Sequence, residues 1–315
     1  MKPRLLSSYP APEECFAPFR DELDITVPDH PLSHEEVVAL IPDYDAFFGV
    51  DFRQDRAVID AGKKLKVVAN RGAGYDSVDV ARCTELGIAV INTPNSVTDA
   101  TAEQTCALIV DVMRGTARYD RWLRRGEWPK DSYPKTNTPI SGSTLGILGL
   151  GRIGKAVARK MQGMGMKILY YNRHQMTPEA ETELSVTYAS FEEILANADC
   201  IAINMPYTPE NHHLFNAETI SKMKPTAYLV NAARGPIVDE IALYEALKNN
   251  VIKGAGLDVF ENEPYPYEGL LTLENVTMTP HAGTSLYECR VAMTQEAIAG
   301  IAAYLRGEQP YNKVN

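Results

Sequence analysis

Cysteine is scarce in this sequence, and its spacing suits neither disulfides nor a structural metal site. The chain of 315 residues contains five cysteines and no C-x-x-C pair, and they are Cys15, Cys83, Cys106, Cys200 and Cys289. A scattered, odd-numbered set argues against a disulfide framework and against a zinc site, and it fits a reduced compartment. We therefore expect a protein without disulfides and without a bound metal.

The sequence also lacks long apolar runs and an excess of basic residues. No segment approaches the roughly 20 apolar residues of a transmembrane helix, and the start, MKPRLLSSYPAPEE, has no apolar core like that of a signal peptide. The formal net charge of −10 disfavours nucleic acid and anionic membranes as partners, since both require a basic face. We expect a cytoplasmic protein, in which a locally positive site could still hold a small anion.

Strand-like and helix-like segments alternate along the whole chain. Apolar runs such as DAFFGV (45–50) alternate with amphipathic segments such as SHEEVVALIP (33–42), which predicts an α/β fold with parallel sheets covered on both faces. The length favours two domains, and we expect a helix at about 100–125 to join them. The strands expected in the second unit are TLGILGLG, KILYYN, CIAINMP, AYLVNAA, GAGLDVF and VTMTPH.

A glycine motif follows the first strand of this second series. Gly149, Gly151 and Gly154 form a G-x-G-x-x-G that lies after a strand and opens a helix. The first glycine permits a tight turn, the second lets the backbone approach a pyrophosphate, and the third allows close strand–helix packing. The helix N-terminus then faces the negative charge. This context favours dinucleotide binding over a purely structural glycine turn.

An acidic residue is missing where nucleotide-binding folds usually place one, at the end of the next strand. The chain has Asn172, Arg173 and His174 there. A carboxylate at this place would bind a ribose 2′-hydroxyl and repel a 2′-phosphate, whereas neutral Asn172 tolerates the phosphate and the two basic residues can pair with it. The sequence therefore favours NADP over NAD. The alternative is that Arg173 and His174 are ordinary solvated loop residues.

Three further loops begin where a strand ends, which is where open α/β sheets carry their chemistry. The loops NAARGPIVDE, LDVFENEP and MTPHAG supply Arg234, Glu263 and His281 in that order. An arginine, a glutamate or a histidine in a loop is most often structural when it occurs alone. The combination of the three is what indicates a catalytic site.

Several segments together resemble the signatures of the D-isomer-specific 2-hydroxyacid dehydrogenases, in the order that this family has them. They are GAGYDSVDV, NTPNSVTDATAEQT, STLGILGLGRIG, MPYTPENHHLFN, VNAARGPIVDE, GAGLDVFENEP and TPHAGTSLYECR. The resemblance implies two doubly wound parallel-sheet domains around a cleft. Residues 1–98 plus 286–315 would form a flavodoxin-like substrate domain, and residues 99–285 a Rossmann coenzyme domain inserted into it.

The chemistry that the resemblance implies suits these residue types. Reduction of a 2-oxo acid needs a hydride at the carbonyl carbon and a proton for the oxygen. His281 suits the proton donor, because an unperturbed histidine has a pKa of roughly 6.5. Glu263 would favour the protonated imidazole and fix its orientation. Arg234 would hold the substrate carboxylate in a fork and polarise the carbonyl.

The resemblance also assigns further contacts. The backbone N–H groups of the loop Arg71, Gly72, Ala73 and Gly74 would cradle the substrate carboxylate. The Arg71 side chain would either select an anionic or polyhydroxy substrate or pair with Asp76. Thr101, and less directly Val97, would contact the nicotinamide end, unless Thr101 is an ordinary residue of a buried helix turn. The coenzyme-binding residues implied are Thr101, Gly149, Gly151, Arg152, Ile153, Gly154, Asn172, Arg173, His174, Pro206, Thr208, Ala233, Asp258 and Gly283.

Within the family, the chain is most similar to the glyoxylate/hydroxypyruvate reductases, including those that reduce 2-ketogluconate. Formate dehydrogenases have Gln where Glu263 stands, and D-lactate dehydrogenases usually keep an acid at the position of Asn172. A D-lactate or other D-2-hydroxyacid dehydrogenase that uses NAD is one alternative. Another is a non-catalytic dinucleotide sensor, similar to the corepressors that share this fold.

The resemblance further implies a homodimer joined through the coenzyme domains. Trp128 lies just after the long predicted helix, where the family's dimer arm lies. It would anchor the dimer contact, because tryptophan is enriched at interfaces. The alternative is that Trp128 reaches the active site of the partner and shapes its substrate pocket.

Overall fold

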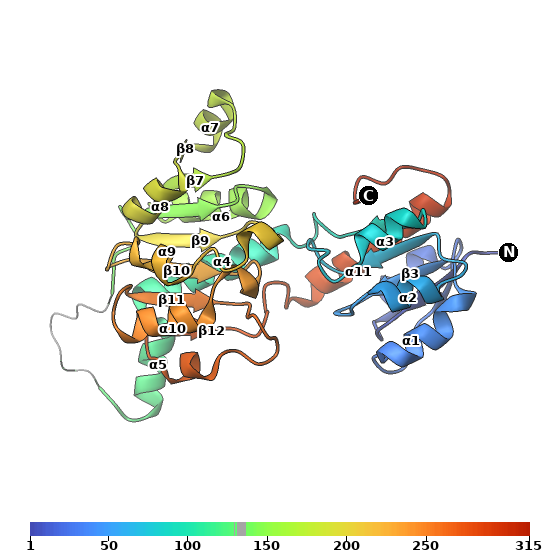
Figure 1. Cartoon of the computed structure of the whole chain (residues 1–315), viewed down its shortest axis with the longest axis horizontal. Helices are drawn as coiled ribbons and strands as arrows, with labels where there is room; N and C mark the ends of the chain where they lie inside the picture. Colours follow the sequence, from blue (N-terminus) through green and yellow to red (C-terminus); the bar gives the residue numbers. More distant parts are fainter. Residues whose placement is uncertain (129, 131–136) are drawn as a thin grey trace. The chain divides into compact units, whose positions relative to one another are not determined.

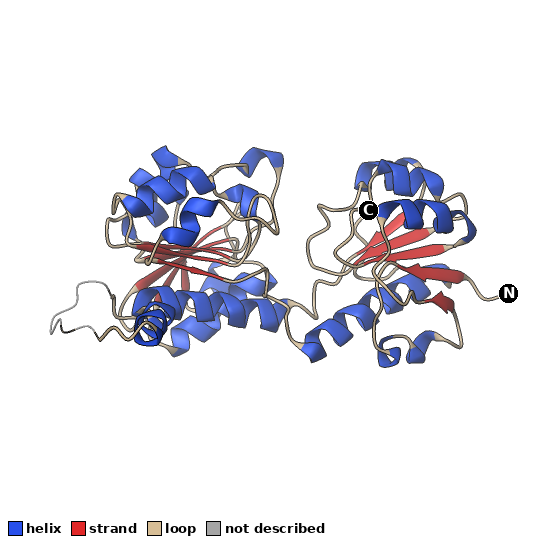
Figure 2. Cartoon of the chain, turned by 90° about the horizontal axis from the view of Figure 1, so that it is seen from below, coloured by secondary structure: helices blue, strands red, loops and turns tan. Residues whose placement is uncertain are grey.

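The computed structural model describes residues 1–128, 130 and 137–315, and the chain divides into two compact units. The first unit comprises Met1–Val97 with Thr284–Asn315, and the second unit comprises Thr98–Gly283. Each unit contains one parallel sheet with helices on both faces (Figures 1 and 2). The α/β fold with two doubly wound sheets is therefore confirmed. No helix among the described residues is both long and apolar enough to cross a membrane.

The first unit contains five parallel strands in the order β2-β1-β3-β4-β5, the flavodoxin-like order. The strands are β1 (Arg4–Ser7), β2 (Asp24–Thr26), β3 (Ala46–Gly49), β4 (Val67–Asn70) and β5 (Ala89–Ile91). The helices are α1 (His34–Leu40), α2 (Arg56–Ala61), α3 (Val80–Glu85) and α11 (Tyr287–Leu305), with the 3₁₀ turns η1 (Glu13–Cys15), η2 (Ala17–Phe19) and η3 (Ile41–Asp43). The apolar run Ala46–Gly49 is wholly buried, as expected of a strand covered on both faces.

The last helix of the chain belongs to the core of this first unit. Ala297, Ile298 and Ile301 of α11 are fully buried in the same cluster as Leu5 of β1 and Phe48 of β3. Two stretches that lie far apart in the sequence therefore build one hydrophobic core.

The second unit contains seven parallel strands in the order β12-β11-β10-β9-β6-β7-β8. The strands are β6 (Thr144–Leu148), β7 (Lys167–Tyr171), β8 (Val186–Tyr188), β9 (Cys200–Ile203), β10 (Tyr228–Asn231), β11 (Gly254–Leu257) and β12 (Val276–Met278). The helices are α4 (Thr98–Arg114), α5 (Thr116–Arg124), α6 (Arg152–Gly163), α7 (Pro178–Leu184), α8 (Phe191–Asn197), α9 (Ala217–Ser221) and α10 (Glu240–Lys248), with η4 (Pro209–Asn211), η5 (Gly235–Ile237) and η6 (Glu268–Thr272). The strand order reverses between β6 and β9, and doubly wound sheets bind ligands at the carboxyl ends of the strands on either side of such a point.

One strand of this sheet is absent from the sequence prediction. The three residues of β8 pair in parallel with β7, opposite Ile168, Leu169 and Tyr170. A run of three residues, V-T-Y, is too short to show an alternating pattern. Pairing with β7 places it in the sheet.

The helix predicted at about 100–125 is two helices, so this prediction was wrong in detail. Gly115 separates α4 from α5 and has a φ of 70°, the left-handed conformation that glycine adopts without strain. The Asp111 side chain accepts a hydrogen bond from the N–H of Ala117 at 2.7 Å and so caps the start of the second helix. The chain therefore changes direction at Gly115 and helix formation restarts after it.

Candidate active site

The glycine motif lies at the switch point of the second sheet. Gly149 follows β6 with a φ of 94°, and an added Cβ would lie 2.6 Å from the backbone nitrogen of Met205, which follows β9. A Cβ on Gly154 would lie 2.3 Å from the carbonyl oxygen of Gly149. A Cβ on Gly151 would meet no atom within 4 Å. The first and third glycines are therefore required by the packing of the protein, whereas Gly151 leaves room for another molecule.

Gly151 is also the N-cap of α6, and within the described part of the chain this position makes no side-chain hydrogen bond to the helix. Arg152 and Ile153 are its first residues, and the N–H groups of a first turn have no partner within their own helix. Such a helix start is a binding site for a phosphate group. The geometry of this loop fits the pyrophosphate of a dinucleotide.

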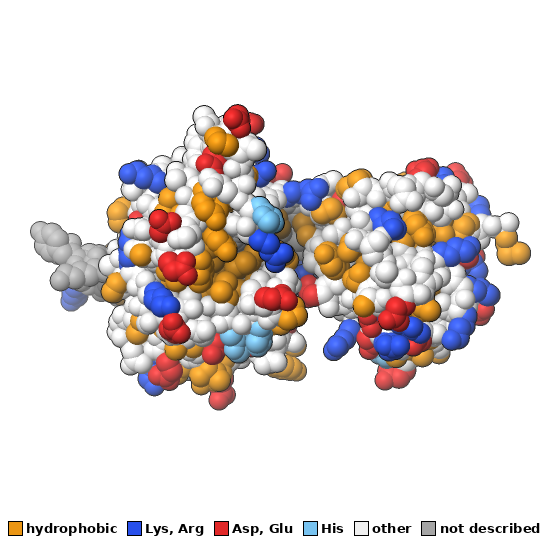
Figure 3. Space-filling model, turned by 45° about the horizontal axis from the view of Figure 1, so that its top comes forward, with side chains coloured by type: hydrophobic (Ala, Val, Ile, Leu, Met, Phe, Trp, Pro, Cys, Tyr) orange, Lys and Arg blue, Asp and Glu red, His pale blue; other side chains and the backbone are white. Residues whose placement is uncertain are grey.

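Asn172 is joined to the same loop. Its Oδ1 accepts a hydrogen bond from the N–H of Leu150 at 2.7 Å, so the neutral side chain holds the end of β7 against the glycine turn. Arg173 and His174, which follow, are both exposed. Figure 3 shows a histidine beside basic side chains on one face of this unit.

The loop that contains these residues is fixed by a buried tyrosine. The hydroxyl of Tyr170 donates to Glu181 at 2.7 Å and accepts from the N–H of Met176 at 2.9 Å. Burial, and then the hydrogen bond to Glu181, raise the pKa of Tyr170 to about 12. The hydroxyl therefore stays protonated and ties residues 172–176 to α7.

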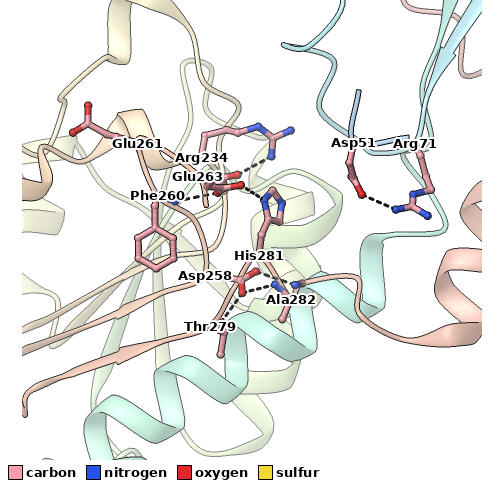
Figure 4. Close-up of polar contacts among 12 residues, drawn as sticks. Asp51, Arg71, Arg234, Asp258, Phe260, Glu261, Glu263, Thr279, His281 and Ala282 are labelled. Atoms are coloured by element: carbon pink, nitrogen blue, oxygen red, sulfur yellow. Dashed lines mark hydrogen bonds and ion pairs between the residues drawn. The ribbon is translucent and has the colours of Figure 1, made fainter. Parts of the chain in front are cut away.

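Arg234, Glu263 and His281 come together at the carboxyl ends of three neighbouring strands, β10, β11 and β12 (Figure 4). Nδ1 of His281 lies 2.8 Å from Oε2 of Glu263. The other carboxylate oxygen of Glu263 accepts from the N–H of Phe260 at 3.1 Å. The side chains of His281 and Glu263 are 51% and 37% exposed, so the pair is fixed by the protein and still open to a ligand.

The charges of this pair support each other. The hydrogen bond that His281 donates to Glu263 raises the pKa of His281, and the negative charges of Glu263 and Asp258 add to the rise. Burial and the positive charge of Arg234 act in the opposite direction. Burial alone would raise the pKa of Glu263, but the hydrogen bond and charge of His281, the Phe260 N–H and the charge of Arg234 together lower it. The arrangement favours an imidazolium beside a carboxylate.

Asp258 holds the turn that presents His281. Its side chain is 1% exposed and accepts hydrogen bonds from the hydroxyl of Thr279 at 2.5 Å and from the N–H groups of Ala282 and Gly283 at 2.7 and 2.9 Å. Its carbonyl accepts from the N–H of His281 at 2.8 Å. These bonds maintain the φ of 50° at His281, a conformation that is uncommon outside glycine. The coenzyme contact predicted for Asp258 stays a prediction.

Close packing brings Arg234 to this pair. A Cβ on Gly235 would lie 1.9 Å from the carbonyl carbon of Phe260, so only glycine lets the loop after β10 lie against the turn that leads to Glu263. The Asn231 side chain fixes the same loop, because it donates to the carbonyl of Arg234 at 2.8 Å and accepts from the N–H of Ala233 at 3.1 Å. Arg234 Nη1 donates to the Ala233 carbonyl at 2.8 Å.

The remaining residues predicted in the second unit lie in helix α4 and on the loop after β9. Thr101 adjoins the turn after His281, since a Cβ on Gly283 would lie 3.6 Å from its methyl carbon. Pro206 and Thr208 follow β9, where Asn211 donates to the carbonyl of Pro206 and accepts from the N–H of Thr208, both at 2.8 Å. Their contacts with a coenzyme stay predictions.

Sequence reasoning missed three polar residues that support the site. They are Asn231, Thr279 and Gln104, whose amide donates to the hydroxyl of Thr279 at 3.0 Å. Asn231 and Thr279 are polar residues at the carboxyl ends of strands, which is the signal that could have identified them. Nothing in the sequence around Gln104 indicates its partner, 175 residues away.

In the first unit, the predicted substrate loop is held by asparagines. Asn70 donates to the carbonyl of Gly74 at 2.7 Å, and Asn92 donates to the carbonyl of Ala73 at 2.8 Å. Arg71, with a side chain 12% exposed, pairs with Asp51 at 2.9 Å, a partner that the sequence did not indicate. The roles predicted for Arg71, Gly72, Ala73 and Gly74 stay predictions.

Comparison with known proteins agrees with this geometry. Residues 106–283 match the NAD binding domain of the D-isomer specific 2-hydroxyacid dehydrogenases. A glyoxylate reductase from Thermococcus onnurineus is 39% identical, with 100% of this chain and 96% of the relative covered. An NADPH-dependent glyoxylate/hydroxypyruvate reductase from Sinorhizobium meliloti, solved with NADP and malonate, has a TM-score of 0.86 at 30% identity and covers 100% of this chain and 97% of that one.

A third relative is a D-lactate dehydrogenase from Aquifex aeolicus, solved with NAD and lactic acid. It has a TM-score of 0.87 at 27% identity and covers 99% of this chain and 98% of that one. The named relatives thus include one solved with NADP and one solved with NAD. This chain belongs to the D-isomer specific 2-hydroxyacid dehydrogenase family and is an NAD(P)-dependent oxidoreductase.

Proposed function

We propose that this chain reduces a small 2-oxo acid, glyoxylate or hydroxypyruvate, to the D-2-hydroxy acid, with 2-ketogluconate as a further candidate substrate. The observation that carries the proposal is the His281–Glu263 pair at 2.8 Å with the charge of Arg234 acting on both. The His281–Glu263 pair lies in the second unit, whose glycine loop fits a dinucleotide. The names of the relatives support the substrate class.

His281, Glu263 and Arg234 have different roles in the proposed reduction. The reduced nicotinamide, when bound, supplies the hydride. Since Nδ1 of His281 is bonded to Glu263, Nε2 is the nitrogen that gives its proton to the substrate carbonyl oxygen. Glu263 keeps the ring oriented before and after the transfer. Arg234 binds the substrate carboxylate and orients the carbonyl towards the proton donor.

The test is a panel of substrates under steady-state conditions. Glyoxylate, hydroxypyruvate, 2-ketogluconate, pyruvate and phenylpyruvate are each assayed with NADPH and with NADH. A clear optimum for glyoxylate or hydroxypyruvate supports the proposal. An optimum for pyruvate with NADH would identify a D-lactate type of dehydrogenase instead, and no turnover with any acid would favour the non-catalytic sensor.

For the coenzyme, we propose a preference for NADP over NAD. The support is the neutral Asn172, which bonds to the glycine loop through its oxygen at 2.7 Å, followed by two exposed basic residues that can pair with a 2′-phosphate. The pKa of Glu210, on the loop after β9, is lowered mainly by a hydrogen bond from the Thr208 hydroxyl. The positive charge of Arg173 lowers it further, though more weakly, so this charge acts on the same loop.

Arg173→Ala is expected to weaken NADPH binding by about tenfold and to leave NADH binding nearly unchanged, since one charge-assisted hydrogen bond to the phosphate is lost. Asn172→Asp is the matched variant, because its carboxylate can still accept from Leu150 while it repels a 2′-phosphate. Coenzyme dissociation constants from fluorescence titration measure both. Equal losses for the two coenzymes in Arg173→Ala would contradict the preference.

The pH dependence of the reduction follows from the raised pKa of His281. His281 must be protonated, and its pKa is raised above 6.5, so kcat/KM for reduction is expected to fall as the pH rises through a midpoint above 6.5. Glu263→Gln replaces the carboxylate with a neutral amide, so the charge-assisted hydrogen bond that contributes most to the rise is lost, and the midpoint should move to lower pH. Profiles of kcat/KM from pH 5 to 10 measure this; a midpoint that Glu263→Gln leaves in place would contradict the pairing.

We also propose a homodimer through the second unit. Trp128 is 77% exposed and Leu123 of α5 is 59% exposed in the single chain, and aromatic residues are enriched at the buried centre of interfaces. The two residues lie five positions apart in the sequence, at the place where the family resemblance puts the dimer arm.

A further inference from the structure

A second group of ionisable side chains lies between the turn that leads to Glu263, which contains Glu261, and the segment after η4, which contains His212 and His213. One ring nitrogen each of His212 and His213 and a carboxylate oxygen of Glu261 lie within 4.8 Å of one another. Within residues 1–128, 130 and 137–315, this is the one such group of three or more His, Cys, Asp and Glu side chains. Figure 4 shows Glu261 pointing away from the His281–Glu263 pair. The group is therefore separate from the proposed catalytic site.

The contacts inside this group concentrate nitrogen and carboxylate ligands. Nε2 of His213 lies 2.6 Å from Oε1 of Glu261, and its Nδ1 lies 3.9 Å from Oδ2 of Asp239. The rings of His212 and His213 stack with their centroids 4.0 Å apart. One imidazole thus lies between two carboxylates, and a second imidazole lies on its face.

The backbone around these side chains is fixed by other parts of the second unit. The N–H of Glu261 donates at 2.6 Å to the carboxylate of Glu240, which is itself buried. The N–H of His213 donates to the carbonyl of Pro236 at 2.8 Å. Asp239 is the N-cap of α10 and uses its Oδ1 for that helix. The backbone of His213, Glu261 and Asp239 is therefore held in place before any ligand binds, whereas the exposed side chain of His212 is held, among the described residues, only by its contacts with Tyr207 and with the ring of His213.

We propose that His212, His213 and Glu261 form a binding site for a divalent transition-metal ion such as Zn²⁺. Imidazole nitrogens and carboxylate oxygens are ligands that Zn²⁺ takes, at about 2.0–2.2 Å in a tetrahedral arrangement. Ligand atoms in such a site are about 3.3 Å apart. The distance between Nε2 of His213 and Oε1 of Glu261 must lengthen by about 0.7 Å to reach this value, and no other pair of ligand atoms needs to approach by more than about 1.5 Å.

The choice of ion follows from the ligand set. Mg²⁺ and Ca²⁺ prefer sites built of oxygen atoms, whereas two imidazoles favour Zn²⁺, Ni²⁺ or Cu²⁺. The ion would take the place of the proton that His213 shares with Glu261. It would also join the segment that contains His212 to the turn between Asp258 and Glu263. A metal bound only by the folded chain raises its thermal stability.

The experiment is a calorimetric titration of the full-length, metal-free chain with ZnCl₂, repeated with MgCl₂. The variants are His212→Gln, which removes an exposed ligand, and Glu261→Gln, which removes the carboxylate. The matched control is His34→Gln, because His34 also contacts a carboxylate, that of Asp55 at 3.1 Å, but lies in the first unit. Circular dichroism spectra verify that each variant is folded.

We expect one Zn²⁺ per chain in the wild type and in His34→Gln, at least about tenfold weaker binding in His212→Gln and Glu261→Gln, and no measurable binding of Mg²⁺. The melting temperature should rise with Zn²⁺ in the wild type and less in His212→Gln. Equal Zn²⁺ affinity in the wild type and His212→Gln would overturn the proposal, and so would a wild type that binds no Zn²⁺. Because metal binding is measured without substrate, the result does not depend on the proposed activity.

Discussion

His281→Asn is expected to lower kcat for reduction by about 10²–10⁴-fold, the range of general acid–base catalysis, while the dissociation constant of the coenzyme changes less than about threefold. Nε2 of His281 is the only proton-donating atom that the proposal assigns to the carbonyl oxygen. Asparagine suits the position because it tolerates the positive φ of 50° better than most residues. Stopped-flow turnover with NADPH and fluorescence titration of the coenzyme measure the two quantities.

The control for this prediction is the partner of the histidine. Glu263→Gln keeps a side chain of the same size next to Nδ1 of His281 and should lower kcat less than His281→Asn does. If His281→Asn instead weakened coenzyme binding as much as it lowered kcat, the histidine would hold the turn between β12 and Gly283 together rather than transfer a proton.

Arg234→Gln is the variant with the second largest expected effect, a loss of about 10²–10³-fold in kcat/KM, which is typical when a group that stabilises charge in the transition state is removed. Glutamine cannot form the two parallel bonds that a guanidinium makes with a carboxylate. Arg234→Lys keeps the charge but loses the fork, so its kcat/KM should lie between those of the wild type and Arg234→Gln.

Arg234→Gln should also shift the pH profile, and a comparison of substrates shows whether Arg234 binds a carboxylate or only supports its loop. The positive charge of Arg234 lowers the pKa of His281, so the midpoint of the pH profile should move to higher pH when that charge is lost. Pyruvate, glyoxylate and an uncharged aldehyde of similar size are compared as substrates. A loss that is equally large for the uncharged aldehyde would mean that Arg234 supports the loop and does not bind a carboxylate.

The sequence predicts those parts of the site that depend on local pattern. Gly149, Gly154 and the residues at the ends of β10, β11 and β12 could be predicted, because the carboxyl ends of parallel strands meet at one edge of a sheet. The contact between Glu263 and His281 requires only that the loops after β11 and β12 lie side by side. They do so because these two strands are neighbours in the sheet.

Other features depend on partners that lie far apart in the sequence. The carboxylate of Asp258 binds N–H groups 24 and 25 residues further on, and Arg71 pairs with an aspartate 20 residues before it. Nothing in the sequence near these N–H groups or near this aspartate marks them as the partners. The break at Gly115 was missed for a different reason, since the helical spacing of apolar residues continues on both sides of it and only the positive φ interrupts the helix.

The order of synthesis gives the two units different folding histories. Thr98–Gly283 is one continuous stretch, so it can fold on the ribosome while the rest of the chain is still being made, as domains commonly do during translation. The first unit must wait, because Ala297, Ile298 and Ile301 of α11 complete its core. Its N-terminal strands therefore remain without that cover until α11 has been synthesised. During this interval they are the part of the chain most exposed to aggregation and most dependent on chaperones.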